Sequence, residues 1–210
     1  MEIIDCGVVS YSDAWELQLN QVQKRRNDEV GDTILLYEHQ PVYTVGTAFK
    51  GEIPNPLPYP IHRIERGGEI TYHGPGQLVI YPIVKLTKPD VTGFLRQLES
   101  SLIELLADFG LKASAARGHT GVWINQKKIA SIGIAVKHWV TFHGAALNVN
   151  PDLSHFQAIK PCGYDPDVMT SLSKELGRNV FVDEIKSQFA SSKYFDENPV
   201  GAVASAQGDP

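Results

Sequence analysis

The chain has very little cysteine, with only Cys6 and Cys162 among its 210 residues. Two cysteines this far apart supply neither a disulfide framework nor the paired CxxC ligands of a zinc site. The seven histidines are scattered and form no HExxH motif, so we expect no metal site. This cysteine usage favours a reducing compartment, and we expect a cytoplasmic protein.

Long hydrophobic runs and an excess of positive charge are also missing. No segment is long and apolar enough to cross a bilayer, and residues 1–9 lack the basic segment that opens a secretion signal. The formal net charge is −5, so no general basic field attracts nucleic acid. A local basic cluster at Lys24, Arg25 and Arg26 fits a solvated helix face, or a docking site for an acidic partner. We expect a protein that binds neither nucleic acid nor membrane.

Apolar patterning predicts one α+β domain over residues 1–190, with a mixed, largely antiparallel sheet and flanking helices gathered on one side of it. Strands are expected at residues 3–9, 33–38, 42–45, 61–65, 78–84, 111–115, 121–125, 128–137 and 140–149. Apolar side chains at helical spacing predict a long helix over 91–109. Shorter helices are expected at 13–30, 170–176 and from 182. Residues 191–210 are rich in Ala, Ser, Gly and Pro and are expected to form a flexible tail.

Lys128 and Cys162 are the candidate catalytic pair. A strand, a turn, a returning strand and a loop separate them, and such a path can bring its two ends together. An ammonium about 4 Å from a thiolate is worth roughly 4 kcal/mol at an effective dielectric near 20. That corresponds to about three pKa units before desolvation subtracts its share. One close lysine therefore suffices to form a thiolate from a cysteine whose usual pKa is near ~8.5.

Both residues also have a purely structural interpretation. Cys162 could be a small buried hydrophobe, the common fate of a lone cysteine. Its Pro-Cys-Gly setting argues against this, because a turn exposes the sulfur and Gly163 lets a substrate approach the backbone. Lys128, taken alone, could be an exposed lysine that protects a strand edge. Lys127 points to the opposite sheet face, so only one of the two lysines can face a pocket.

Three segments rich in small residues are candidates for a binding slot. The first is RGGEITYHGPGQ at residues 66–77, which matches no phosphate loop of the GxxxxGK type. The others surround Gly133 and Gly144. A slot lined by glycine and alanine suits an extended alkyl chain better than a sugar or nucleotide. Wide turns and tight strand packing explain each segment separately, and His73 and His143 are either pocket hydrogen-bonders or satisfied core histidines.

Four ordered motifs together resemble the octanoyltransferase family of lipoate biosynthesis: RGGEITYHGPGQ, KIASIGIAV, FHGAALNVN and IKPCG. The resemblance runs from roughly Tyr11 to Gly177 and implies a catalytic domain similar to that of biotin and lipoate protein ligases. It implies that Cys162 is the acyl-thioester nucleophile and that Lys128 lowers its pKa. The substrate-binding segments of the family correspond to Arg66, Gly67, Gly68, Glu69, Ile70, Thr71, Tyr72, His73, Ser131, Ile132, Gly133, Gly144, Ala145 and Ala146.

The reaction implied by this resemblance is octanoyl transfer from octanoyl-acyl carrier protein, through a Cys162 thioester, to the ε-amine of a lipoyl-domain lysine. Expected acceptors are lipoyl domains of 2-oxoacid dehydrogenase acyltransferase subunits and the glycine cleavage H protein. The donor is already a thioester and carries its own phosphopantetheine, so neither ATP nor an enzyme cofactor is expected. We expect a monomer, with the proline-rich segment 50–60 sheltering the acyl chain.

Three alternatives stay open at this stage. An ATP-dependent lipoate or biotin ligase needs an adenylate site, often marked by an Arg-Gly-Arg-rich loop, which the sequence lacks. A cysteine hydrolase would pair Cys162 with His143 or His155. A non-catalytic module that binds lipoyl domains or carrier proteins would not need Cys162 at all.

Overall fold

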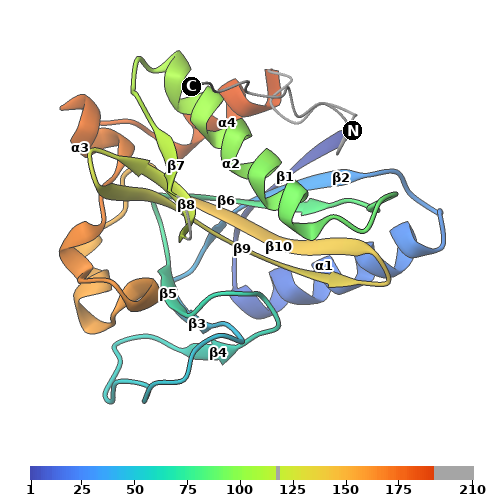
Figure 1. Cartoon of the computed structure of the whole chain (residues 1–210), viewed down its shortest axis with the longest axis horizontal. Helices are drawn as coiled ribbons and strands as arrows, with labels where there is room; N and C mark the ends of the chain where they lie inside the picture. The colour runs from blue at the N-terminus through green and yellow to red at the C-terminus, as the bar shows by residue number, and fades with distance from the viewer. Residues whose placement is uncertain (117–118, 192–210) are drawn as a thin grey trace, which may run out of the picture.

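A seven-stranded sheet forms the centre of the computed structural model, which describes residues 1–116 and 119–191 (Figure 1). Its strands are, in spatial order, β1 (Glu2–Val9), β2 (Thr33–His39), β6 (Gln77–Ile83), β10 (Val140–Asn148), β9 (Lys127–Lys137), β8 (His119–Ile124) and β7 (Ser114–Ala116). The β1–β2 pair is parallel and the other pairs are antiparallel. The expected mixed, largely antiparallel sheet is therefore confirmed, with β1 at one edge.

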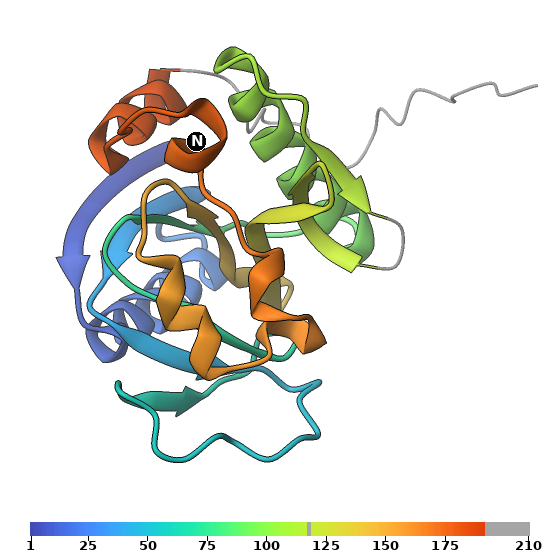
Figure 2. The ribbon, with the colours of Figure 1, turned by 90° about the vertical axis from the view of Figure 1, so that its left-hand side faces the viewer.

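A second sheet of three short strands lies beside the large one, in the order β4 (Ile61–Arg63), β3 (Val42–Val45) and β5 (Ile70–His73). Its apolar cluster is completed by the turn η1 (Leu153–Ala158) and by side chains from the proline-rich segment 50–60. Figure 2 shows the two further turns, η2 (Pro161–Gly163) and η3 (Pro166–Val168), at the same end of the molecule, above the small sheet.

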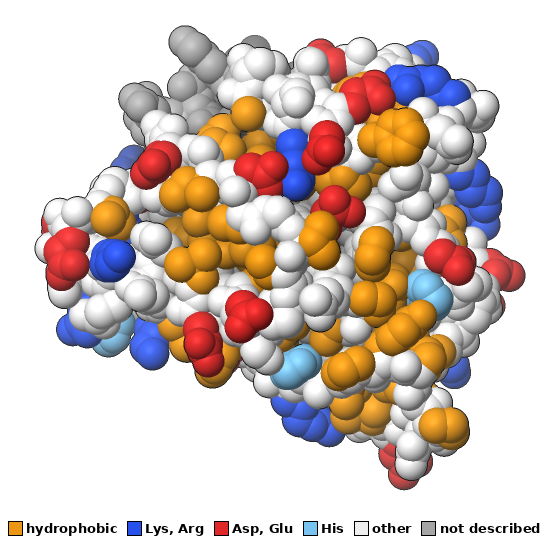
Figure 3. Space-filling model, turned by 180° about the vertical axis from the view of Figure 1, so that it is seen from behind, with side chains coloured by type: hydrophobic (Ala, Val, Ile, Leu, Met, Phe, Trp, Pro, Cys, Tyr) orange, Lys and Arg blue, Asp and Glu red, His pale blue; other side chains and the backbone are white. Residues whose placement is uncertain are grey.

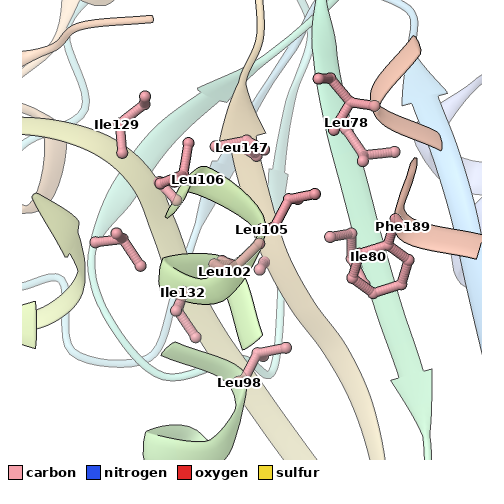
Figure 4. Close-up of a cluster of buried hydrophobic side chains, with 14 of the residues drawn as sticks. Leu78, Ile80, Leu98, Leu102, Leu105, Leu106, Ile129, Ile132, Leu147 and Phe189 are labelled. Atoms are coloured by element: carbon pink, nitrogen blue, oxygen red, sulfur yellow. The ribbon is translucent and has the colours of Figure 1, made fainter. Parts of the chain in front are cut away.

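Helices cover both faces of the large sheet. On one face lie α2 (Val91–Asp108) and α4 (Val182–Ser191), which bury leucines and Phe189 against β6, β9 and β10 (Figure 4). On the other face α1 (Tyr11–Arg26) packs Ala14 and Val22 against β2, β6 and β10. The expectation that the helices gather on one side is wrong. The central strands are apolar on both faces, so each face has to be covered.

The ends of the helices follow from local capping. Helix α1 begins after Ser10, whose side chain accepts a hydrogen bond from the Asp13 amide, and ends at Arg26 rather than at Val30. The helix expected from residue 13 therefore begins two residues earlier, at Tyr11. Helix α2 begins after Asp90, which accepts from the Gly93 amide at 2.7 Å. Ser171 caps the short α3 (Leu172–Leu176), and Gly177 ends it in the left-handed region.

Pro82 interrupts the pairing of two central strands. The β6–β10 ladder runs as far as the Ile80–Ala145 pair and resumes at the Lys85–Val140 bridge in the same register. Proline has no amide hydrogen to donate, and opposite this gap His143 adopts φ +57°. The amide of His143 instead donates to Gln18 Oε1 of α1 at 2.7 Å. Pro82 therefore marks a gap inside the sheet.

The outer surface carries charges of both signs without one continuous basic area on the face shown in Figure 3. The expected basic cluster at the end of α1 is partly neutralised, because Arg25 pairs with Asp28 and Asp32. Among the described residues, no helix has the length and apolar character needed to cross a membrane.

Candidate active site

Two adjoining pockets occupy the junction of the loop 64–69 with β5, β9 and β10. The narrow pocket, of about 30 Å³, is lined by Ile64, Arg66, Gly68, Thr71, His73, Tyr81, Ser131, Ile132, Gly133, His143, Gly144, Ala145 and Ala146. The wide pocket, of about 380 Å³, is lined by Gly67, Gly68, Glu69, Val91, Leu95, Thr120, Lys128, Ile132, Gly133, Ile134 and Tyr164. Gly68, Ile132 and Gly133 line both pockets, so the two spaces are adjacent.

The loop 66–69 is held in place by the buried guanidinium of Arg66. Its Nη2 donates to the carbonyl oxygen of Thr44 at 3.0 Å, to the Thr44 hydroxyl at 2.9 Å and to the carbonyl oxygen of Glu69 at 2.8 Å. Its Nη1 donates to the carbonyl oxygen of Gly67 at 2.9 Å. Arg66 is therefore mainly a clamp that shapes the loop, because its donors are directed at the chain itself.

Close backbone contacts require glycine at two positions of this junction, Gly133 and Gly46. The Gly67 amide donates to the carbonyl oxygen of Ile134 at 3.0 Å, which fixes the loop against β9. A Cβ atom at Gly133 would lie 2.7 Å from the Gly67 carbonyl oxygen, and one at Gly46 would lie 2.4 Å from that of Gly68. Neither position has space for a side chain.

Strand β5 divides its predicted site residues between two faces. Thr71 and His73 line the narrow pocket. Ile70 and Tyr72 point the other way, into the apolar cluster of the small sheet, and line neither pocket. The alternation of side chains along a strand accounts for this division. The proline-rich segment 50–60 likewise contributes no described residue to either pocket, so its expected sheltering role has no support at this position.

Lys128 lies in the wide pocket with only 2% of its surface exposed. Its Nζ lies 5.5 Å from the centre of the Trp123 ring and 5.8 Å from that of the Tyr164 ring. Gly121 closes another side, because a Cβ atom there would lie 2.7 Å from Cε and 3.3 Å from Nζ of Lys128. The purely structural interpretation of Lys128, as an exposed lysine that protects a strand edge, is therefore wrong.

The backbone of Cys162 lies in the turn η2, while its side chain is outside the described part of the structure. Its neighbours locate the turn. A Cβ atom at Gly163 would lie 3.2 Å from the Glu69 carboxylate, and Tyr164 reaches the ammonium of Lys128. Both Glu69 and Tyr164 line the wide pocket, so the turn that carries Cys162 lies beside it.

Three buried histidines lie at or near the narrow pocket: His73 and His143 line it, and His39 contacts Tyr81, which also lines it. Burial lowers the pKa of His39 to about 4, and its Nε2 lies 2.9 Å from the Tyr81 hydroxyl. Burial also lowers the pKa of His143 to about 4, against the opposing effect of the Glu65 carboxylate 3.4 Å away. The pKa of His73 is lowered well below its usual value by burial and by the nearby His39 and Arg66. All three are neutral near pH 7, which suits an apolar ligand.

The comparison with known proteins decides the family. Residues 10–192 match the Lipoyl protein ligase A/B catalytic domain family. The octanoyltransferase of Pelobacter propionicus is 46% identical over 194 residues, which cover 90% of this chain and 92% of the relative.

The chain belongs to the octanoyltransferase family.

Two solved structures place the same fold in a wider group. A lipoate-protein ligase A, whose crystal structure holds ATP, superposes with a TM-score of 0.71 at 15% identity, covering 90% of this chain and 81% of the ligase. A biotin protein ligase from Aquifex aeolicus gives a TM-score of 0.55 at 12% identity, over 90% and 67% of the two chains. The family resemblance and the ligase-like fold predicted for this octanoyltransferase-family chain are therefore confirmed.

Several residues at or near the site of this octanoyltransferase-family chain could not be identified from its sequence. His39 lies just beyond the strand predicted at 33–38, and the sequence does not indicate that its ring lies 5.9 Å from that of His73. Tyr81 is one apolar-strand residue among several, and Trp123 one residue of a short strand. The strand pairing β2–β6 places Tyr81 on the narrow pocket, where it contacts His39, and the pairing β8–β9 places Trp123 opposite Lys128. His155 packs on Tyr59 and Tyr72 and lines neither pocket, which weakens its candidacy as a catalytic base.

Proposed function

We propose that this enzyme moves an octanoyl group from octanoyl-acyl carrier protein to the ε-amine of a lipoyl-domain lysine, through a thioester on Cys162. The observation that carries the proposal is the buried ammonium of Lys128, which lies in the wide pocket beside the turn of Cys162. That pocket shares Gly68, Ile132 and Gly133 with the narrow one. The wide space suits the reacting groups, and the narrow one, which at about 30 Å³ holds only water-sized groups, would have to open to accept the unbranched acyl chain.

The first half of the reaction loads the enzyme. The Cys162 thiolate attacks the thioester carbonyl carbon of the donor, and the bond from that carbon to the phosphopantetheine sulfur breaks. Lys128, as its ammonium, gives a proton to the departing sulfur. The donor leaves as a free thiol, the octanoyl group remains on Cys162, and Lys128 is neutral.

The second half transfers the acyl group. The ε-amine of the acceptor lysine attacks the Cys162 thioester, and neutral Lys128 accepts a proton from that amine. The carbon–sulfur bond breaks, and Cys162 leaves as a thiolate beside a restored ammonium. Both steps exchange one acyl derivative for another of equal or lower energy, so the reaction needs no ATP. The acceptors are lipoyl domains of 2-oxoacid dehydrogenase acyltransferase subunits and the glycine cleavage H protein.

The residues of the narrow pocket have supporting roles in this proposal. The small residues of the paired strands β9 and β10 line the narrow pocket, and the acyl chain would lie along them: Ser131, Gly133, Gly144, Ala145 and Ala146. Ile132 supplies apolar contact, and Thr71 and His73 line the wall that β5 provides. Arg66, Gly67 and Gly68 keep the loop against β9, and Glu69 lies next to the turn of Cys162.

A transfer assay with matched lysine variants tests the proposal. Enzyme, octanoyl-acyl carrier protein and a lipoyl domain are mixed without ATP, and the mass of the lipoyl domain is followed. We expect it to gain one octanoyl group, and Lys128→Met to slow this by on the order of a hundredfold or more, as loss of a general acid–base does. Lys127→Met is the control, since Lys127 is exposed and donates to the Asp167 carbonyl oxygen.

Three results would contradict the proposal. The first is full activity of Lys128→Met. The second is a reaction that proceeds only with ATP and free octanoic acid, which would assign the chain to the ligase chemistry of its structural neighbours. Release of free octanoate as fast as donor is consumed would indicate a hydrolase.

A further inference from the structure

Two aromatic rings enclose the ammonium of Lys128, and we propose that Trp123 and Tyr164 are positioning residues for this lysine. The inference deepens the proposed function and rests on it. Each ring centre lies within 6 Å of Nζ, at 5.5 Å for Trp123 and 5.8 Å for Tyr164. This is the range in which the face of an aromatic ring attracts a cation. The two rings also pack on each other, with centres 5.2 Å apart at an interplanar angle of 72°.

Trp123 is placed by strand pairing. It lies directly opposite Lys128 across the β8–β9 pair, so the two side chains share one face of the sheet. Its indole Nε1 is buried without a hydrogen-bond partner in the described part of the chain. Burying an indole N–H in this way costs stability, and a purely apolar side chain would avoid that cost. Packing alone therefore does not account for a tryptophan at this position.

Tyr164 links the lysine to the turn of Cys162. It stands two residues after Cys162, directly after η2, and its amide donates to the carbonyl oxygen of Pro161 at 3.1 Å. The residue that contacts the ammonium is thus fixed to the same turn as the proposed nucleophile. Through this contact a shift of the turn and a shift of the lysine are coupled.

Two aromatic rings are suitable partners for a lysine that has to donate and accept protons during the reaction. A carboxylate partner would accept hydrogen bonds from the ammonium and compete for its protons. Among the described residues Lys128 forms no ion pair, and the buried acid Glu99 pairs with Arg96 and accepts from the Gly121 amide at 3.0 Å. Aromatic faces attract the charge and accept none of its protons in a conventional hydrogen bond. The ammonium is held in place while its protons remain available to the departing thiol.

Paired substitutions separate the effect of the aromatic ring from the effect of side-chain volume. Trp123→Leu and Tyr164→Leu remove a ring and keep an apolar side chain; Trp123→Phe and Tyr164→Phe keep a ring. Trp139→Leu is the control, because Trp139 is 51% exposed in the β9–β10 turn. The measurements are kcat and KM for octanoyl-acyl carrier protein, and the rate of iodoacetamide alkylation at Cys162 against pH, followed by peptide mapping.

We expect each leucine variant to lower kcat on the order of tenfold with KM little changed, since loss of a buried cation–π contact is of that size. The alkylation profile should move to higher pH, because the displaced ammonium no longer favours the Cys162 thiolate. The phenylalanine variants should retain most activity, and Trp139→Leu all of it.

The inference is overturned if folded Trp123→Leu and Tyr164→Leu keep the wild-type kcat and alkylation profile. It is also overturned if the phenylalanine and leucine variants lose equal activity with an unshifted profile, since that indicates packing alone. Lys128→Met distinguishes the two proposals. If that variant is inactive while the aromatic variants are unaffected, only this inference fails; if Lys128→Met is active, the proposed function fails first.

Discussion

Gly133 lines both pockets and lies directly against the loop 66–69. Its Cα faces the carbonyl oxygen of Gly67, and a Cβ atom would stand 2.7 Å from that oxygen and 3.3 Å from Arg66 Cδ. The nearest atom belongs to backbone, so the loop 66–69 has to move if a side chain is added. The contact is therefore a structural requirement of the site and not only of the strand.

Gly133→Ala is expected to displace this loop and lose octanoyl transfer. The overpacking should lower the free energy of unfolding by about 1–3 kcal/mol, measured by urea denaturation. Gly31→Ala is the matched control, because no atom lies within 4 Å of its would-be Cβ and its φ is not positive. Unchanged stability and transfer rate in Gly133→Ala would show that the loop does not pack against β9 as described.

The sequence indicates some residues of the site better than others. The segment 66–73 was recognisable from its glycines and polar residues, but the sequence did not separate Thr71 and His73 from Ile70 and Tyr72. That division depends on which face of β5 meets β9 and β10. Tyr81 belongs to an ordinary buried strand, and only a long-range pairing gives it a place at the narrow pocket and brings it to His39.

Elements with local signals are predictable in position. The helix α2 and the hairpin β9–β10 agree with expectation to within one residue at each end, because periodicity, Gly110 and the tight turn are local. The side of the sheet that a helix covers is not local. Helix α1 lies opposite α2 because the parallel crossover from β1 to β2 carries it there. Likewise Pro82 signals a missing donor but not which strand faces it.

Capping of α1 gives a test at the level of one element. Ser10 Oγ accepts from the Asp13 amide at 3.2 Å and donates to the Asp13 carboxylate at 2.7 Å. Ser10→Ala should lower the free energy of unfolding by about 1 kcal/mol, the usual value of an N-cap. Ser12→Ala changes an exposed serine two residues further on, inside the first turn of the helix, and should have a much smaller effect. Equal effects in the two variants would place the start of the helix elsewhere.

At the scale of the whole molecule, buried neutral histidines make stability depend on pH. The pKa of His39 is about 4 in the folded state, below the value near 6.5 of an exposed histidine. Between these values the unfolded chain binds more protons, so acidification favours unfolding. The stabilisation is complete above about pH 6.5 and is lost by about pH 4. His143 and His73 act in the same direction.

Urea denaturation at pH 7 and pH 4.5 should therefore differ by on the order of a few kcal/mol, at about 1.4 kcal/mol per pKa unit. His39→Gln should reduce that difference, while His62→Gln, which is only half-buried, serves as the control. Carboxylates with lowered pKa values, such as Asp5 and Asp28, lose their stabilising effect mainly at lower pH. Equal unfolding free energies at the two pH values would contradict the burial of these histidines as neutral groups.

The division of the chain at residue 190 stays a prediction, since residues 192–210 lie outside the described part. The central claim for the molecule as a whole is that acyl transfer passes through the enzyme itself. Intact-mass analysis of the enzyme after mixing with octanoyl-acyl carrier protein tests this most directly. The account predicts one octanoyl group on wild type and on Cys6→Ser, none on Cys162→Ser, and loss of the group when a lipoyl domain is added. An enzyme that never gains mass while the lipoyl domain does, or an adduct that survives in Cys162→Ser, would contradict it.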